Sequence, residues 1–138
     1  MKPIFTAEVN TVGGRDGHTK STDGVLDLKL AMPKELGGPG GHATNPEQLF
    51  AAGYSACFEG AMGVVARMQG KSVKDASINS RVTLNGLEDK SLKLSVEMKV
   101  KVPGLSREET QDIVNKAHEI CPYSRAVKGN IDVKFEVV

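Results

Sequence analysis

The sequence has no tryptophan, and only two tyrosines and two cysteines among its 138 residues. We therefore expect no aromatic platform on which nucleic-acid bases could stack, and the formal net charge of +1 is too small to attract a polyanion. Residues 1–10 become polar after three apolar positions and lack the apolar core of an export signal. We expect a cytoplasmic protein that binds no nucleic acid, whose two cysteines are free or redox-active.

Long uninterrupted apolar runs are also missing. The longest, residues 49–66, is broken by Ser55, Glu59 and three glycines, which favours a buried helix over a membrane span. No internal repeat, low-complexity tract or linker divides the chain, and 39% of its residues are apolar. These features predict one globular domain over residues 1–138 that does not enter a membrane.

The N-terminal third predicts three strands and a loop. Strands are expected at 3–12, 18–22 and 25–31, with a glycine-flanked turn at 13–17 and a hairpin at Asp23-Gly24. In the third strand leucines alternate with Asp27 and Lys29, which predicts one buried and one exposed face. Residues 32–44 are rich in glycine and are expected to form an irregular loop.

The next segment predicts a long helix with clear end signals. Asn45 suits the N-cap, Pro46 suits the first helical position, and Glu47 complements the positive end of the helix dipole. The helix is expected to run to about Gln69 and to end at Gly70. Because its middle is apolar on almost every side, we predict that it is the central buried helix.

The remaining residues predict two long strands, a helix and a last strand. The strands are expected at 75–85 and 91–102, and the final one at 130–137. Ser106 and Glu109 have the spacing of a capping box, and Pro122 ends or kinks the helix that follows it. The order is βββ-α-ββ-α-β, an α+β fold with an antiparallel sheet packed on a central helix.

Cys57 and Cys121 are the candidate reactive residues, although each could instead be an unreactive packing residue. A free cysteine in a helix is most often a small packing residue, and burial leaves its thiol inert. The 64 residues between the two exclude a local Cys-x-x-Cys motif. On two packed helices they could instead meet as a reversible disulfide, formed after a peroxide oxidises Cys57 to a sulfenic acid.

Two charged residues and the histidines complete the candidates. Arg15 lies in the glycine-flanked turn, where a solvated charge and a site cation are both open interpretations. Glu47 is about 15 Å of helix away from Cys57, so if it serves the thiol site we expect it to come from a second subunit or to act through Arg15. His118 and Cys121 could face one metal ion, but no further ligands are evident, and we predict neither a metal nor a cofactor.

Several segments resemble the organic hydroperoxide resistance (Ohr) branch of the OsmC/Ohr family. They follow the family order along nearly the whole chain, and the most specific is the cysteine-containing run ATNPEQLFAAGYSACF at 43–58. The others are GGRDG at 13–17, DGVLD at 23–27, ELGG at 35–38, CPYS at 121–124 and GNIDV at 129–133.

The resemblance implies an intertwined homodimer of OsmC-like fold with active sites at the subunit interface. It implies that Cys57 attacks the peroxide, that Cys121 resolves the sulfenic acid as a disulfide, that Arg15 activates the thiolate and that Glu47 holds Arg15. It further implies organic and fatty-acid hydroperoxides as substrates, and dihydrolipoamide or a lipoylated protein as the reductant. Two other classes stay open: a redox sensor or small-ligand binding protein without turnover, and an interaction protein with inert cysteines.

Overall fold

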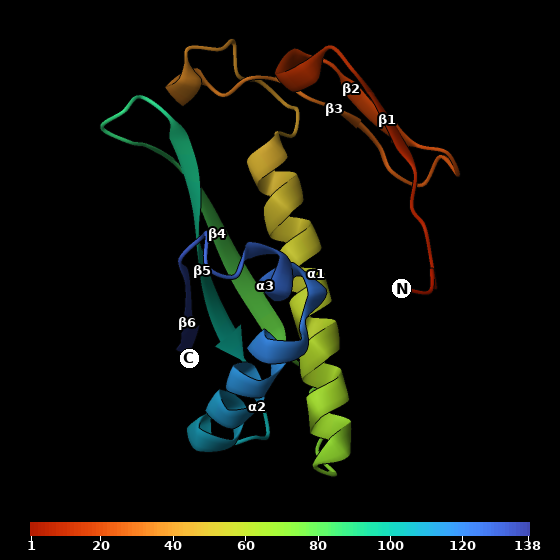
Figure 1. The fold of residues 1–138 in the computed structure, drawn as a ribbon, viewed down its shortest axis with the longest axis vertical. Helices are drawn as coiled ribbons and strands as arrows, with labels where there is room; N and C mark the ends of the chain where they lie inside the picture. Colours follow the sequence, from red (N-terminus) through yellow and green to blue (C-terminus); the bar gives the residue numbers. More distant parts are fainter. The chain divides into compact units, whose positions relative to one another are not determined.

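The computed structural model describes residues 1–138 and contains six strands, three α-helices and two short 3-10 helices (Figure 1). The chain divides into two compact units, residues 1–49 and residues 50–138, and each is described by itself. Helix α1 (Pro46–Met68) begins in the first unit and continues in the second. The single domain over 1–138 stays a prediction.

The first unit is built on a three-stranded antiparallel sheet in the order β1-β2-β3. Its strands are β1 (Val9–Val12), β2 (His18–Ser21) and β3 (Asp27–Lys29), and its 3-10 helices are η1 (Gly14–Asp16) and η2 (Lys34–Leu36). The Asp23-Gly24 hairpin is confirmed, since Gly24 has a φ of 75° and its N–H donates to the carbonyl of Ser21.

Three expectations for this unit were wrong in detail. The first strand starts at Val9 rather than residue 3. Its ladder with β2 begins at the Val9–Ser21 pair, and β2 leads into the Asp23-Gly24 hairpin after one further hydrogen bond, from the Thr22 N–H to the Glu8 carbonyl. The loop 32–44 contains one ordered turn, η2. Of the alternating leucines, Leu30 is buried whereas Leu28 is 38% exposed.

The ends of α1 follow the predicted chemistry. The Asn45 Oδ1 accepts a hydrogen bond of 2.8 Å from the N–H of Gln48, Pro46 is the first helical residue, and Gly70 adopts a φ of 67° just beyond the last turn. Length and composition make α1 the one helix that could cross a membrane, a test that core helices of soluble proteins also meet. The helix therefore ends at Met68, one residue before the predicted end at Gln69.

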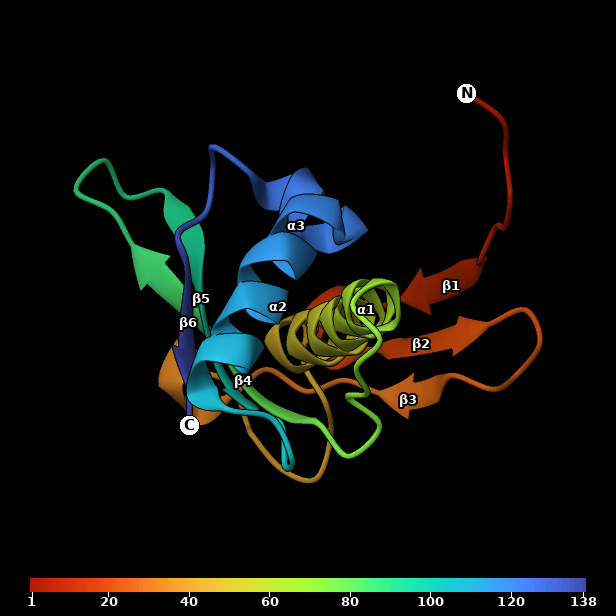
Figure 2. The ribbon, with the colours of Figure 1, turned by 90° about the horizontal axis from the view of Figure 1, so that it is seen from below.

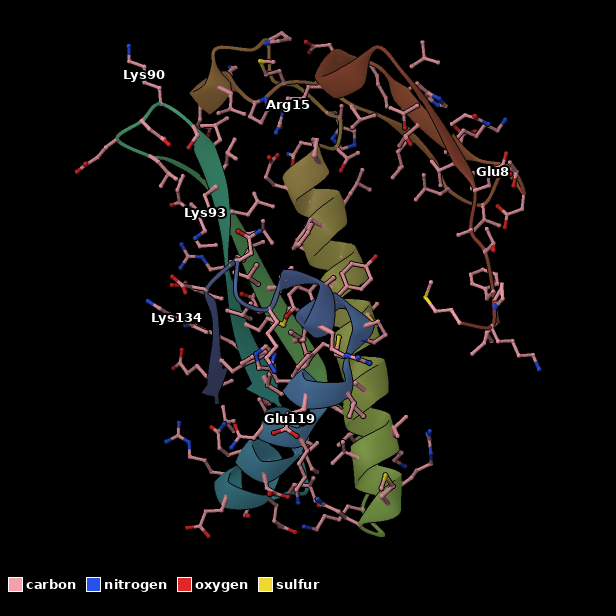
Figure 3. All side chains as sticks on the ribbon, viewed as in Figure 1. Glu8, Arg15, Lys90, Lys93, Glu119 and Lys134 are labelled. Atoms are coloured by element: carbon pink, nitrogen blue, oxygen red, sulfur yellow. The ribbon has the colours of Figure 1, made fainter.

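The second unit packs three helices on one face of a sheet in the order β4-β5-β6 (Figure 2). The strands are β4 (Ser77–Gly86), β5 (Leu92–Lys101) and β6 (Val133–Val137), and the two further helices are α2 (Arg107–Ile120) and α3 (Pro122–Val127). Lys93 and Lys134 lie on the sheet face away from the helices (Figure 3). The predicted capping box is present, since Ser106 and Glu109 each accept a hydrogen bond from the other's backbone N–H.

This unit corrects the predicted topology in two places. The β4–β5 pair is antiparallel as expected, but β5 and β6 are parallel, so the sheet is mixed. Pro122 ends α2 and also starts the short helix α3, so the order is βββ-α-ββ-αα-β. Proline suits the first turn of a helix as well as it stops the preceding one.

The core of the second unit lies between α1, α2 and the sheet. The rings of Phe58 on α1 and Phe135 on β6 stack with centroids 4.7 Å apart, and His118 on α2 packs against the same Phe135 ring in a T-shaped arrangement. The prediction of a central buried helix holds for one face of α1 within this unit. The opposite face carries Ala56, Gly60 and Val64 and remains exposed.

Candidate active site

The two cysteines approach each other in the second unit, although 64 residues separate them in sequence. Cys57 lies in the middle of α1, and Cys121 lies at the corner where α2 ends and α3 begins. Their Sγ atoms are 3.6 Å apart and both thiols are free. Cys121 is fully buried whereas Cys57 is partly exposed. The arrangement suits a thiol that a solute can reach, with a second thiol in contact behind it.

The corner that carries Cys121 has defined backbone geometry. The Cys121 N–H donates to the carbonyl of Ala117 at the end of α2, and its carbonyl accepts from the N–H of Arg125 in α3. Its φ and ψ of −61° and 123° are extended, as expected for a residue that precedes a proline. The backbone therefore turns at the cysteine itself, which directs the sulfur toward α1.

The surroundings of Cys57 within residues 50–138 favour its neutral thiol. Burial raises the pKa of Cys57, the adjacent Cys121 thiol raises it further, and only the backbone N–H of Tyr123 acts in the opposite direction. No cationic side chain contributes to this balance. A reactive thiolate at this position requires a positive charge that the second unit does not supply.

Aromatic rings line the region beside the two sulfurs. Tyr54, one helical turn before Cys57, stacks on Tyr123 with centroids 5.8 Å apart, and Phe50 meets both rings edge-on. Tyr123 crosses α1 at Gly53, where a Cβ atom would lie 2.9 Å from the tyrosine hydroxyl. Gly53 thus permits the close approach of Tyr123 to α1, which places the Tyr123 ring against Tyr54 and Phe50 next to the thiols.

Two buried hydroxyls and a histidine form a chain around the same corner. The Ser124 Oγ lies 2.7 Å from the Tyr54 hydroxyl and 2.9 Å from the His118 Nδ1. Burial lowers the pKa of His118, the positive charge of Lys128 lowers it further, and Glu119 partly opposes both. The ring is therefore neutral at pH 7 and is available as a hydrogen-bond partner.

Arg15 and Glu47 form a two-point ion pair within the first unit. The guanidinium donates from its two terminal nitrogens to the two carboxylate oxygens, at 2.9 and 2.7 Å. The hydrogen bond from Arg15 lowers the pKa of Glu47, and the same bond raises the pKa of Arg15. Arg15, the middle residue of η1, is therefore held as a fixed cation (labelled in Figure 3).

The turn that presents Arg15 depends on its glycines. A Cβ atom on Gly17 would lie 1.7 Å from the carbonyl oxygen of Val12, so no other residue fits there without moving the backbone. The carboxylate of Asp16 accepts from the N–H of Met32 at 2.9 Å and ties the turn to the following loop. The motif GGRDG thus sets both the path of this backbone and the position of the arginine.

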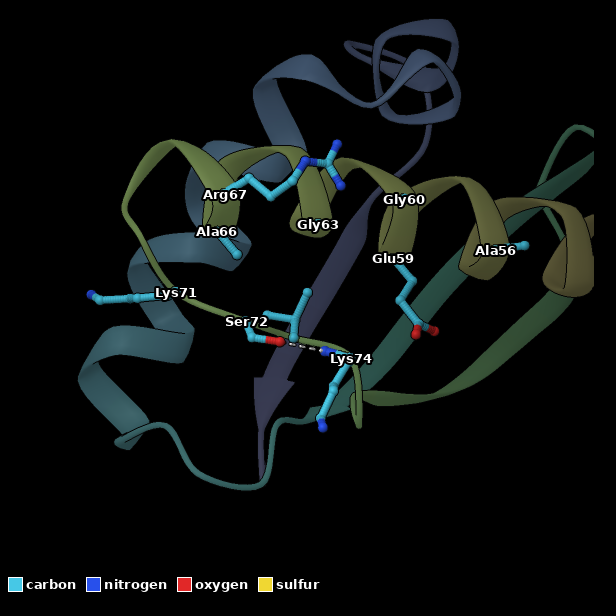
Figure 4. Close-up of a pocket in the computed structure, with 10 residues that line it drawn as sticks. Ala56, Glu59, Gly60, Gly63, Ala66, Arg67, Lys71, Ser72 and Lys74 are labelled. Carbon is cyan, nitrogen blue, oxygen red and sulfur yellow. Dashed lines mark hydrogen bonds between the residues drawn. The ribbon is translucent and has the colours of Figure 1, made fainter.

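A groove of about 600 Å³ runs along the exposed face of α1 in the second unit (Figure 4). Ala56, Gly60 and Gly63 form its small-residue floor on α1, and the segment 71–74 forms its other wall. Glu59 and Lys74 extend from its two sides (Figure 4). Since Ala56 directly precedes Cys57, the groove adjoins the segment of α1 that carries the accessible thiol.

The four residues expected from the sequence thus form two pairs. Cys57 lies against Cys121, and Arg15 binds Glu47. His118, considered as a metal ligand, bonds to Ser124, and no group of three or more metal-binding side chains lies close enough to hold an ion. Tyr54 and Ser124 were not among the predicted site residues, although Tyr54 lies three residues before Cys57 and Ser124 three residues after Cys121.

The fold and this site define an OsmC-like protein. Residues 38–136 match the family model described as OsmC-like protein, so the chain belongs to that family. Within it, the chain belongs to the branch of the organic hydroperoxide resistance proteins, as two curated relatives and a crystal structure indicate.

The organic hydroperoxide resistance protein OhrB of Bacillus subtilis (strain 168) is 50% identical over 97% of this chain and 98% of its own length. The organic hydroperoxide resistance protein of Xanthomonas axonopodis pv. citri (strain 306) is 49% identical over 96% of this chain and 93% of its own. The crystal structure of an organic hydroperoxide resistance protein from Legionella pneumophila has a TM-score of 0.92 and 52% identity, and covers 99% of this chain and 98% of its own. The predicted fold class is confirmed by this likeness.

Proposed function

We propose that the protein is a cytoplasmic, cysteine-based peroxidase that reduces organic hydroperoxides and so protects the cell against organic peroxide stress. The observation that carries the proposal is the contact between Cys57 and Cys121, whose sulfur atoms are 3.6 Å apart on separate helices. The names of its relatives, organic hydroperoxide resistance proteins, agree with this role.

The first step is attack of the Cys57 thiolate on the hydroperoxide. Its sulfur forms a bond to the terminal peroxide oxygen as the O–O bond breaks, which leaves a sulfenic acid and an alkoxide that takes up a proton to become the alcohol. Because burial raises the pKa of Cys57, the step needs a cation. We assign that role to Arg15, which also stabilises the charge that develops on the leaving oxygen.

The second step is resolution by Cys121. Its sulfur attacks the Cys57 sulfur, the S–O bond breaks, and the hydroxyl leaves as water with the Cys121 proton. A dithiol then returns the disulfide to two thiols and is itself oxidised to a disulfide. We propose dihydrolipoamide or a lipoylated protein as this reductant, a role that the resemblance to the Ohr branch implies.

The preference for organic peroxides follows from the apolar surroundings of the thiols. Phe50 and Tyr123 present partly exposed aromatic rings beside the thiols, which favours an alkyl tail over water. We therefore expect hydroperoxides of bulky alkyl groups and fatty acids to react faster than hydrogen peroxide.

The active protein is proposed to be an intertwined homodimer. Each unit leaves apolar surface uncovered: Val64 on α1 is 40% exposed, and Phe5 in the N-terminal segment is 84% exposed. Glu47 and Cys57 are ten residues apart on α1, about 15 Å of helix, which favours supply of the Arg15–Glu47 pair by the second subunit. Sedimentation should give twice the mass of the chain.

A titration of thiols tests the peroxidase function against its alternatives. Reduced protein receives one equivalent of tert-butyl hydroperoxide, and we expect both free thiols to disappear. With dihydrolipoamide and excess peroxide we expect repeated turnover. Retention of both thiols after the first addition contradicts the proposal, and thiol loss without turnover in the second identifies a redox sensor.

A further inference from the structure

The hydrogen-bond chain His118–Ser124–Tyr54 joins residues on either side of Cys121 to each other and to the helix that carries Cys57. His118 precedes Cys121 by three residues on α2, and Ser124 follows it by three residues on α3, so their 2.9 Å contact closes the corner with Cys121 at its centre. The 2.7 Å contact from Ser124 to Tyr54 then ties this closed corner to α1, three residues before Cys57. Residues three apart on a helix share one side of it.

We propose that His118, Ser124 and Tyr54 are positioning residues for the resolving step, because they fix the Cys121 sulfur within reach of the oxidised Cys57. This inference rests on the proposed function and deepens it. The three side chains act through the backbone corner that carries Cys121 and through the helix that carries Cys57. The disulfide-forming step therefore depends on them, whereas the attack of Cys57 on peroxide does not.

The burial of the chain gives these contacts their strength. Tyr54 and Ser124 are 0% and 1% exposed, so water does not replace a hydrogen bond that is lost there. Three separate helices contribute one member each. Apart from the contact between Cys121 and Cys57 themselves, the Ser124–Tyr54 bond is the side-chain hydrogen bond that joins the α2–α3 corner to α1. Without the chain, the corner is held to α1 by apolar and aromatic contacts, which are less directional.

The donors and acceptors assign a direction to the chain. With a neutral ring and Nδ1 as acceptor, Ser124 donates to His118 and Tyr54 donates to Ser124, so that each hydroxyl proton has an acceptor. The reverse direction leaves the Tyr54 hydroxyl proton without a partner, since Ser124 is its one hydrogen-bonding neighbour. The required group at position 118 is therefore a hydrogen-bond acceptor placed like Nδ1.

Single-turnover kinetics separate the two steps. Reduced protein is mixed with one equivalent of tert-butyl hydroperoxide, the loss of peroxide reports the attack, and a sulfenic-acid probe added at intervals reports resolution. In Ser124→Ala and Tyr54→Phe we expect the rate of disulfide formation to fall roughly tenfold while the rate of peroxide loss stays that of the unaltered protein.

Position 118 supplies the decisive comparison. His118→Leu removes the acceptor and should slow resolution as Ser124→Ala does, whereas His118→Asn places an amide oxygen near the Nδ1 position and should restore most of the rate. Thr110→Val is the matched control: it removes another buried hydroxyl from α2, the one that bonds to the Ser106 carbonyl at 2.9 Å. It should lower stability without changing the resolution rate.

Two outcomes overturn the inference. One is an unaltered rate of disulfide formation in Ser124→Ala and Tyr54→Phe. The other is an equal decrease of that rate in His118→Asn, His118→Leu and Thr110→Val, which would indicate a general loss of packing instead. Either result leaves the peroxidase function intact as long as the unaltered protein consumes peroxide. If the unaltered protein itself forms no sulfenic acid, the proposed function fails first.

Discussion

The guanidinium of Arg15 and the carboxylate of Glu47 are joined by two hydrogen bonds, 2.9 and 2.7 Å long, from separate nitrogens to separate oxygens. Such a fork fixes the arginine in direction as well as in distance, which a single contact does not. The pair thus presents an oriented cation within the first unit, and the Cys57 thiol in the second lacks one. The proposed peroxidase mechanism combines the two pairs, with Arg15 as the cation that the Cys57 thiolate needs.

Removal of the Arg15 guanidinium should make the Cys57 thiol much less reactive. In Arg15→Ala we expect peroxide consumption to fall about a hundredfold, because the Cys57 thiolate and the leaving oxygen both lose their stabilising charge. Arg15→Lys should recover only part of the rate, since an ammonium cannot make the two-point contact with Glu47. Initial rates with tert-butyl hydroperoxide and the alkylation rate of Cys57 at pH 7 measure both effects.

Arg81→Ala serves as the matched control, because its ion pair with Glu97 at 3.6 Å lies in solvent on the outer sheet face. It should leave both rates unchanged. A full rate in Arg15→Ala would remove Arg15 from the mechanism.

Acid should weaken the first unit through Glu47. The pKa of this carboxyl is lowered by the hydrogen bond from Arg15, so the folded state binds its proton less readily than the unfolded chain. Its contribution to stability is therefore complete above the ordinary value of 4.5 and is lost as the pH falls through the lower folded value.

Glu47→Gln should remove that part of the pH dependence. Thermal unfolding followed from neutral pH to below pH 4.5 should show a steeper loss in the unaltered protein than in the variant. Parallel curves for the two proteins would mean that the ion pair contributes no pH-dependent stability.

The Arg15 turn should be sensitive to a single methyl group. In Gly17→Ala the new Cβ meets the Val12 carbonyl, so the backbone of the turn must move and Arg15 with it. We expect a stability loss of about 1–3 kcal/mol in denaturant unfolding, together with a loss of peroxidase activity similar to that of Arg15→Ala. Gly86→Ala, where no atom lies within 4 Å of the added Cβ, should change neither. Equal behaviour of the two variants would contradict the steric argument.

Features set by local chemistry could be predicted from the sequence, and those set by long-range packing could not. The ends of α1 follow from Asn45, Pro46 and Gly70, and the start of α2 follows from the Ser106–Glu109 capping box. Strand alternation located β5 but not the direction of its pairing with β6, because the same alternation suits parallel and antiparallel partners.

The site divides in the same way. That Cys57 and Cys121 are in contact depends on how the α2–α3 corner packs on α1, which no spacing along the chain specifies. The short helix α3 was missed because Pro122 was interpreted only as a stop, and with it the role of Ser124 in the chain to Tyr54 was missed. The resemblance to the Ohr branch implied the roles of the two cysteines, whereas the contacts that hold them became visible only in three dimensions.

The two cysteines should fail in different ways when each is replaced. Cys57→Ser loses the nucleophile, so it should consume no peroxide. Cys121→Ser keeps an accessible Cys57 but has a hydroxyl in contact with it, and a serine does not displace the oxygen of a sulfenic acid. It should therefore consume one equivalent of peroxide and then stop in the dithiol assay.

Mass spectrometry of the stalled Cys121→Ser protein makes the distinction quantitative. We expect one added oxygen at Cys57, trapped by a sulfenic-acid probe, and further oxidation only with excess peroxide. The unaltered protein treated in the same way should lose two hydrogens and gain no oxygen, as a disulfide requires. Equal multiple turnover in both variants would show that neither sulfur has its assigned role, because only a Cys57 that attacks and a Cys121 that resolves predict two different defects.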